Sequence, residues 1–172
     1  MKVTFRVCLQ LKALSRGVVV AGEKNLDNRI KNISVLDAGS AEETVLYNAR
    51  PEELILTTFS GMRNDASAQI DTIRELSKAG VSGMVILQRE NAADHHYYKE
   101  VIRTAEEAGL PLVILAEGTG TGYSQIISQV MEKVLYSSNF KNSLINNTIF
   151  HLLNFEKHSS FQQALREAAV SN

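Results

Sequence analysis

The feature that most constrains the fold is a helix-then-strand segment that occurs twice. Residues 73–80 and residues 102–109 both begin Ile-Arg and end Ala-Gly, with corresponding positions 29 residues apart. Each copy has helical spacing of small or apolar residues, stops at the Ala-Gly pair and leads into a short apolar run. One repetition is too few for a solenoid, which needs three or more units.

A third apolar run precedes the first of these helices, so the chain reads strand, helix, strand, helix, strand. Consecutive βαβ units place their strands parallel in one sheet. Strands buried on both faces read as unbroken apolar runs, as these do. The sequence therefore predicts an α/β fold, a three-layer domain with a mainly parallel sheet and C-terminal helices, whose strands lie near 54–57, 82–87 and 112–116.

The flanking segments are predicted from shorter patterns. Residues 4–14 have Thr4 as an N-cap and apolar residues on one helical face, which predicts a helix. Extended segments follow at 18–21 and 30–35, and we expect this N-terminal part to pack at the edge of the sheet. A short helix is predicted over 41–48. A long helix begins near Tyr123 and carries an apolar stripe made of Ile126, Ile127, Val130, Met131, Val134 and Leu135.

The composition changes near Ser137, where the chain becomes polar and rich in Asn. Beyond it, Ile145, Ile149 and Leu152 suggest short amphipathic helices that have no strands beside them. We therefore predict a domain over 1–137 and a helical connector over 138–172 that leads toward a domain absent from this chain.

Composition excludes several classes of protein. No run approaches the roughly 18 apolar residues of a membrane span, and the N-terminus has no apolar signal segment. The single cysteine, Cys8, fits a reducing cytoplasm. A net charge of -1 without a basic cluster argues against direct binding of DNA by these residues.

Seven short motifs occur in the order seen in the N-terminal domain of PucR-type purine-catabolism regulators, and residues 3–135 resemble that domain. The motifs are Leu11–Leu14, Val20–Gly22, Leu26–Arg29, Ile33–Val35, Glu53–Thr58, Ala79–Gly80 and Gly109–Leu112. Two features depart from the family pattern. Phe59-Ser60-Gly61 replaces the usual Gly after two threonines, and the Gly118–Gly122 loop is not part of the common pattern.

The resemblance implies the regulatory domain of a cytoplasmic bacterial transcription regulator. Such a domain would sense a small-molecule effector, with a purine-pathway metabolite expected, or would mediate assembly into a homodimer. In that family a C-terminal helix-turn-helix binds DNA, and nothing in this sequence resembles it. Two alternatives remain: an oligomerisation module without a ligand, which would bury the stripe from Ile126 to Leu135 between subunits, and an enzyme acting on a phosphate-containing metabolite.

Ligands of open parallel sheets bind beyond the carboxyl ends of the strands. The loops 57–63, 88–90 and 117–122 follow the three predicted strands, so we expect them to share one edge. Gly118, Gly120 and Gly122 lie between a strand and a helix, where backbone N–H groups can hold an anion. Their spacing matches neither the dinucleotide fingerprint nor the P-loop, so a flexible turn is the alternative interpretation.

Thr57, Thr58 and Arg63 supply two hydroxyls and a guanidinium, a set that can hold a polar or anionic metabolite. The structural alternative is that Thr58 or Ser60 starts a turn, that Asn64 or Asp65 caps the next helix, and that Arg63 is solvated.

The sequence predicts no catalytic residues, no metal site and no cofactor. Asp94-His95-His96 lacks a third ligand at zinc spacing and is interpreted as a solvated helix start. Cys8 lies on an apolar helical face and is interpreted as a small core residue. Asp27 and Arg29 are interpreted as structural charges within a loop.

Overall fold

The computed structural model describes residues 2–88, 95–116, 121–138 and 166. The chain divides into two compact units, Met1–Val134 and Leu135–Asn172, and the first of them holds the sheet. The predicted connector over 138–172 lies almost wholly outside the described residues and stays a prediction. Among the described residues, no helix is long and apolar enough to cross a membrane.

A five-stranded sheet forms the middle of the domain. Its strands are β1 (Val18–Ala21), β2 (Asn32–Val35), β3 (Glu53–Thr57), β4 (Gly83–Gln88) and β5 (Leu112–Ala116). They lie in the order β1-β5-β4-β3-β2, and every neighbouring pair is parallel except β1 with β5. The prediction of a mainly parallel sheet built from βαβ units is confirmed.

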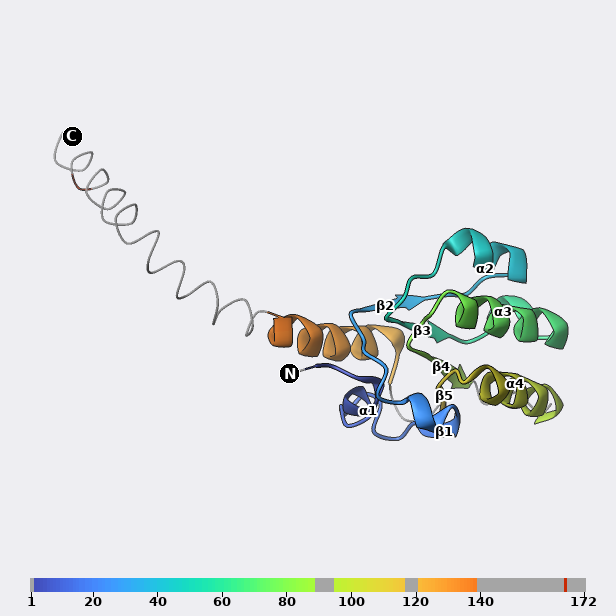
Figure 1. The fold of residues 1–172 in the computed structure, drawn as a ribbon, viewed down its shortest axis with the longest axis horizontal. Coiled ribbons are helices and arrows are strands. Elements are labelled where there is room, and N and C mark those ends of the chain that lie inside the picture. Colours follow the sequence, from blue (N-terminus) through green and yellow to red (C-terminus); the bar gives the residue numbers. More distant parts are fainter. Residues whose placement is uncertain (1, 89–94, 117–120, 139–165, 167–172) are drawn as a thin grey trace. The chain divides into compact units, whose positions relative to one another are not determined.

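Three helices cover one face of the sheet. These are α2 (Ala41–Tyr47), α3 (Ala66–Lys78) and α4 (His95–Ala108), seen together in Figure 1. The Ala-Gly stops are explained by Gly80 and Gly109, whose φ angles of 76° and 67° favour a residue without a Cβ. Buried side chains from this face of the strands and from α3 and α4 form one core cluster, which includes Ile55, Met84, Ile86, Leu112, Ile73, Leu76, Val101 and Ala105.

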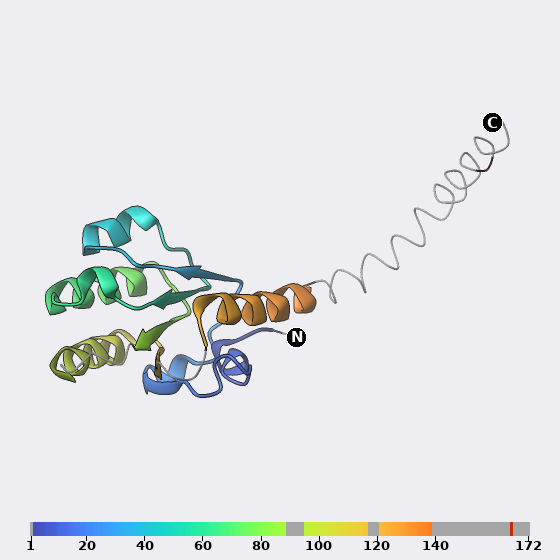
Figure 2. The same cartoon turned by 180° about the vertical axis from the view of Figure 1, so that it is seen from behind.

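The opposite face is covered by α1 (Phe5–Cys8) and by the helical residues 123–138, of which the part up to Val134 belongs to this unit. Its core alternates along the strands with the first cluster and includes Leu54, Leu56, Val85, Val113, Leu115, Phe5, Cys8, Ile126 and Val130. Figure 2 shows the same arrangement from behind, with α2, α3 and α4 on one side of the strands and α1 on the other. The domain thus has the three predicted layers.

The N-terminal segment differs from its prediction in two ways. The helix expected over 4–14 covers only α1, although Thr4 is its N-cap as predicted and accepts the N–H of Val7 at 3.3 Å. Tighter turns replace it, with N–H groups bonded three residues back, from Gln10 to Val7 and from Leu14 to Leu11. Furthermore, the two N-terminal strands do not share an edge, because β1 lies beside β5 and β2 lies beside β3.

Close packing at β4 explains how α1 is held. The Phe5 ring is fully buried and lies against Gly83, where a Cβ would be 2.5 Å from the ring atom Cε1. Only a residue without a side chain allows the aromatic ring to approach the strand this closely.

Candidate ligand-binding site

The carboxyl ends of the parallel strands meet at one edge of the sheet, as predicted. The register pairs Val35 of β2 with Leu56 of β3, Thr57 with Ile86 of β4, and Gln88 with Ala116 of β5. The last residues of β2, β3, β4 and β5 therefore lie along one edge of the sheet, which we call the carboxyl edge.

The loop after β3 holds Thr57 and Thr58, and it is shaped by their hydroxyls. Thr57 Oγ1 accepts the N–H of Phe59 at 3.0 Å, and Thr58 Oγ1 accepts the N–H of Ser60 at 3.3 Å. Phe59 has a φ of 53°, a left-handed conformation that is unusual for a residue other than glycine. The predicted turn at these threonines is present, and its tightness follows from two consecutive bonds of hydroxyl to backbone.

Arg63 follows the short 3-10 helix η2 (Ser60–Met62) and is exposed. It makes no ion pair with any residue in the described ranges. Asp65 caps α3 by accepting the N–H of Ala68 at 2.9 Å. The structural interpretation of Asp65 is therefore confirmed, while the interpretation of Arg63 as a ligand-binding residue stays a prediction.

Asp37, which the sequence reasoning missed, joins these elements. It lies two residues beyond β2, and its Oδ1 accepts the N–H and the hydroxyl of Thr58, each at 3.2 Å. The Thr57 hydroxyl is 3.4 Å from the same oxygen. Ligands bind beyond the carboxyl ends of parallel strands, and applying this rule to the segment 30–35 as well as to the three central strands would have predicted Asp37.

Tyr123 contacts the same carboxylate and packs on the face of the sheet that α1 covers, opposite to α2, α3 and α4. Its hydroxyl donates to Asp37 and lies 3.3 Å from Oδ1 and 3.4 Å from Oδ2. Tyr123 is the first residue of the helix 123–138, so this contact ties the start of that helix to the ends of β2 and β3. We call Asp37, Thr57, Thr58 and Tyr123 the carboxyl-edge cluster.

The glycine-rich loop is only partly within the described residues. Gly118 and Gly120 lie outside them, so their role in anion binding stays a prediction. Gly122 is described and is exposed, but its N–H donates to Gln125 Oε1 at 2.7 Å. The Gln125 side chain bonds back to the N–H of the residue before the helix, as the Glu or Gln of a capping box does, and so satisfies one N–H at the helix start.

Three further residues have structural roles. Asp27 pairs with Arg6 at 2.9 Å rather than with Arg29, and the hydrogen bond from Arg6 lowers the pKa of the Asp27 carboxyl.

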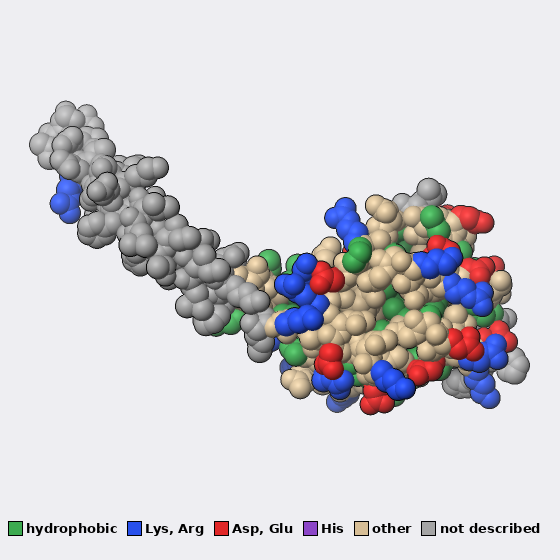
Figure 3. Space-filling model, in the orientation of Figure 1, with side chains coloured by type: hydrophobic (Ala, Val, Ile, Leu, Met, Phe, Trp, Pro, Cys, Tyr) green, Lys and Arg blue, Asp and Glu red, His purple; other side chains and the backbone are tan. Residues whose placement is uncertain are grey.

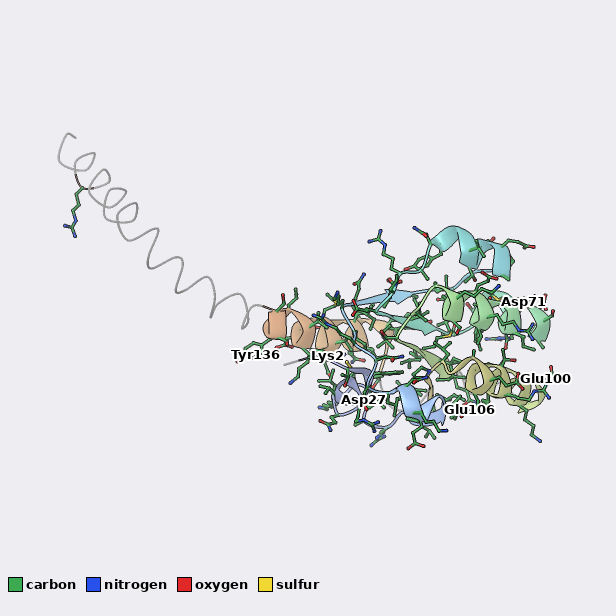
Figure 4. The ribbon with its side chains drawn as sticks, viewed as in Figure 1. Lys2, Asp27, Asp71, Glu100, Glu106 and Tyr136 are labelled. Atoms are coloured by element: carbon green, nitrogen blue, oxygen red, sulfur yellow. The ribbon has the colours of Figure 1, made fainter. Side chains whose placement is uncertain are left out.

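Figure 4 shows Glu106 of α4 beside the 3-10 helix η1 (Glu23–Asn25), where its carboxylate accepts the N–H of Gly22 at 2.7 Å. Cys8 is fully buried, and burial raises the pKa of its thiol to about 11, so it is a core residue.

The described residues contain no group of three potential metal ligands, and Asp94 of the sequence Asp94-His95-His96 lies outside them. On the face shown in Figure 3, Lys and Arg side chains are interspersed with Asp and Glu over much of the surface. Among the described residues, this face shows no single continuous basic surface of the kind that binds duplex DNA.

Comparison with known proteins gives one finding. A family model described as the purine catabolism regulatory protein-like family (PucR) matches residues 7–134. Curated proteins gave no match. The matched residues include all five strands, α2, α3, α4 and the carboxyl-edge cluster, and they make up most of the chain. The chain therefore belongs to the PucR, purine catabolism regulatory protein-like, family.

Proposed function

We propose that this domain is the ligand-sensing part of a bacterial transcription regulator and that it binds a small polar metabolite at the carboxyl edge. Family membership supports a regulatory role. DNA would be bound by a separate helix-turn-helix domain of the regulator, in the cytoplasm where the DNA lies. The domain itself would carry out no catalysis.

One observation carries the proposal: the Tyr123 hydroxyl bonds to Asp37 among the strand ends. A ligand that takes over Asp37 must displace the tyrosine or form bonds beside it. Either event changes the contacts of the helix that begins at Tyr123. A ligand that prefers one arrangement of this contact shifts the population toward it, which is what a sensor requires.

The chemistry of the cluster suits a purine or a ring-opened purine product. The Asp37 carboxylate accepts hydrogen bonds from N–H groups, which these molecules carry in adjacent positions. The Thr58 hydroxyl donates its proton to Asp37, so a ligand that displaces this bond can accept that proton instead. Arg63, five residues further along the chain, is exposed and can donate to a carbonyl or carboxylate oxygen. Gly118 and Gly120 stay candidates for an anionic group of the same ligand.

The test is calorimetric titration of the chain with purine bases, nucleosides and ring-opened products, repeated with Asp37→Asn. This substitution keeps the size of the side chain and removes its charge. We expect a heat of binding with the wild type and an affinity at least about tenfold lower in Asp37→Asn, the effect of losing one hydrogen bond to a charged group. Asp71→Asn, on the exposed surface of α3 (Figure 4), is the matched control. Absence of heat and of any thermal shift across the panel would refute ligand sensing.

The second candidate is homodimerisation, and the structure limits how it can occur. Ile126 and Val130 were expected to pack between subunits, but both are fully buried in the core of their own domain. Leu135 of the stripe and the adjacent Tyr136 are 54% and 70% exposed, so these two side chains can contact a partner. Ile145, Ile149 and Leu152 lie outside the described residues.

Light scattering tests this candidate. If the chain is a dimer through these residues, Leu135→Glu should shift the mass to that of a monomer, while Val18→Glu at another exposed apolar site should not. A wild-type chain that stays monomeric at high concentration would exclude the dimer.

A further inference from the structure

We propose a second ligand site, specific for small oxyanions, in a pocket of about 480 Å³. The pocket lies between the turn that precedes β1 and the first turns of the helix 123–138. Lys12, Ser15 and Arg16 line it from the turn, and Thr121, Gln125 and Gln129 line it from the other side. We call it the basic pocket. Its volume is within the range of small-molecule sites.

Topology explains why these two segments meet. β1 runs antiparallel to β5 and pairs Val18 with Ile114, so the amino end of β1 lies toward the carboxyl end of β5. The turn before β1 and the segment after β5 are thereby brought together. None of these residues belongs to the carboxyl-edge cluster, so the inference does not rest on the proposed sensing site.

The two glutamines present donors to the pocket. Gln129 Oε1 accepts the backbone N–H of Ala13 at 2.9 Å, and Gln125 Oε1 accepts that of Gly122 at 2.7 Å. A backbone N–H can only donate, so the oxygen of each glutamine amide is the atom that accepts this bond. The NH2 group of each glutamine is then the part that can donate to a ligand. These NH2 groups have no hydrogen bond to other residues that the structure describes.

The charges of the lining have one sign. Lys12 and Arg16 are exposed and form no ion pair within the described part of the chain, and no described lining residue is acidic. Further along the helix, Glu132 and Lys133 carry opposite charges that offset each other. Ser15 is an exception to the donor pattern, because its hydroxyl donates to the Lys12 carbonyl at 3.0 Å.

Two cationic side chains together with two amide NH2 groups match a dianion with several acceptor oxygens. Arginine and lysine form the stronger, charge-assisted hydrogen bonds with such groups, and the amides add neutral donors. The chemical class is therefore a phosphate or a dicarboxylate, bound without contribution from the threonines and Asp37 at the other end of the edge.

Gln125→Glu is the sharpest test. The glutamate keeps an oxygen for the Gly122 N–H, and an acidic residue suits the first turn of a helix, so the fold should be preserved or slightly stabilised. The same change replaces an NH2 donor of the pocket with a negatively charged oxygen. We expect anion affinity to fall about tenfold or more, as for loss of a charge-assisted bond, while the melting temperature does not decrease.

The experiment is NMR and calorimetric titration of the full chain with inorganic phosphate and, separately, with malonate. We expect the side-chain amides of Gln125 and Gln129 to shift, and both the double variant Lys12→Ala/Arg16→Ala and Gln125→Glu to lose most of the binding. Lys24→Ala, an exposed lysine outside the pocket, should bind as the wild type does.

Tighter binding of phosphate would assign a phosphorylated ligand, and tighter binding of malonate would assign a dicarboxylate. Two results would overturn the proposal: no shift with either anion at millimolar concentration, or equal affinity in the wild type and both pocket variants. Asp37→Asn leaves the basic pocket intact and should bind both anions normally, which separates this result from the test of the sensing site.

Discussion

Replacing Gly83 by alanine should destabilise the domain, because the new methyl group would enter the space of the Phe5 ring. An alanine Cβ at this position would lie 2.5 Å from Cε1 and 2.6 Å from Cδ1 of Phe5, and 3.0 Å from the carbonyl oxygen of Pro111. Phe5 is fully buried and the third atom belongs to the backbone, so neither neighbour can move away cheaply.

The expected loss is the difference between two effects. Overpacking of a core costs about 1–3 kcal/mol, and distances this short place the site near the upper end. Alanine in a strand regains about 0.5–1 kcal/mol relative to glycine, because glycine loses more backbone entropy on folding. The net loss is about 2 kcal/mol, which lowers the melting temperature of a chain of this size by roughly 4–8 °C.

Thermal and urea unfolding of four variants measure this. Gly39→Ala is the control, since its methyl group would meet only the exposed Glu43 carboxylate at 3.2 Å, and it should melt near the wild type. In a Phe5→Leu background, which shortens the side chain facing β4, Gly83→Ala should cost clearly less, with a coupling of about 0.5–3 kcal/mol. Equal losses in both backgrounds would refute the idea that the Phe5 ring is the obstacle.

Three other predictions concern the caps and the charges. Asp65→Ala should lower the unfolding free energy by about 1 kcal/mol through loss of the α3 N-cap, as measured by urea unfolding, and an equal effect of Asp71→Ala would contradict this. The pKa of the Cys8 thiol is raised from 9.0 to about 11, so the stabilisation from its buried neutral form is complete below pH 9 and is lost as the pH rises through 11. Wild type should therefore lose more stability over this interval than Cys8→Ala, and parallel pH profiles would show that the thiol does not contribute. Arg6→Gln removes an ion pair whose side chains are 50% and 68% exposed, so the urea midpoint should hardly change at physiological salt; a clear drop would show that the pair stabilises the fold.

The sheet could be predicted from the sequence because its central strands are buried on both faces. Leu54, Ile55 and Leu56 leave no polar face, and that pattern fits parallel strands between helices. The Ala-Gly stops marked the helix ends, since Gly80 and Gly109 take positive φ angles. A local signal of this kind predicts where a helix ends because the positive φ angle there strongly favours glycine.

The N-terminal helix was overestimated for a physical reason. Val7, Leu11 and Leu14 have helical spacing, but tight turns replace a regular helix after α1, and only Leu11 and Leu14 of the three join the core on this face of the sheet. Likewise, a strand pattern does not state which edge a strand joins. The placement of β1 next to β5 depends on contacts between residues more than 90 positions apart, for example Val18 with Ile114.

The candidate site was predicted in part. Thr57 and Thr58 were found because they follow a recognisable strand, and the carboxyl-end rule holds for any parallel sheet. Asp37 and Tyr123 were missed because the segment 30–35 is less regular and a tyrosine at a helix start carries no signal of its own. The basic pocket was missed because its two walls come from opposite ends of the domain.

The pairing of β1 with β5 has a consequence for synthesis of the protein on the ribosome. The first strand to emerge must wait for the last strand of the sheet before it can find its neighbour. Until β5 has been synthesised, β1 has no partner strand and the apolar face against which Phe5 packs is incomplete. The domain therefore cannot fold in stages from its N-terminus. Long-range pairing of this kind slows folding and makes completion of the domain a single late event.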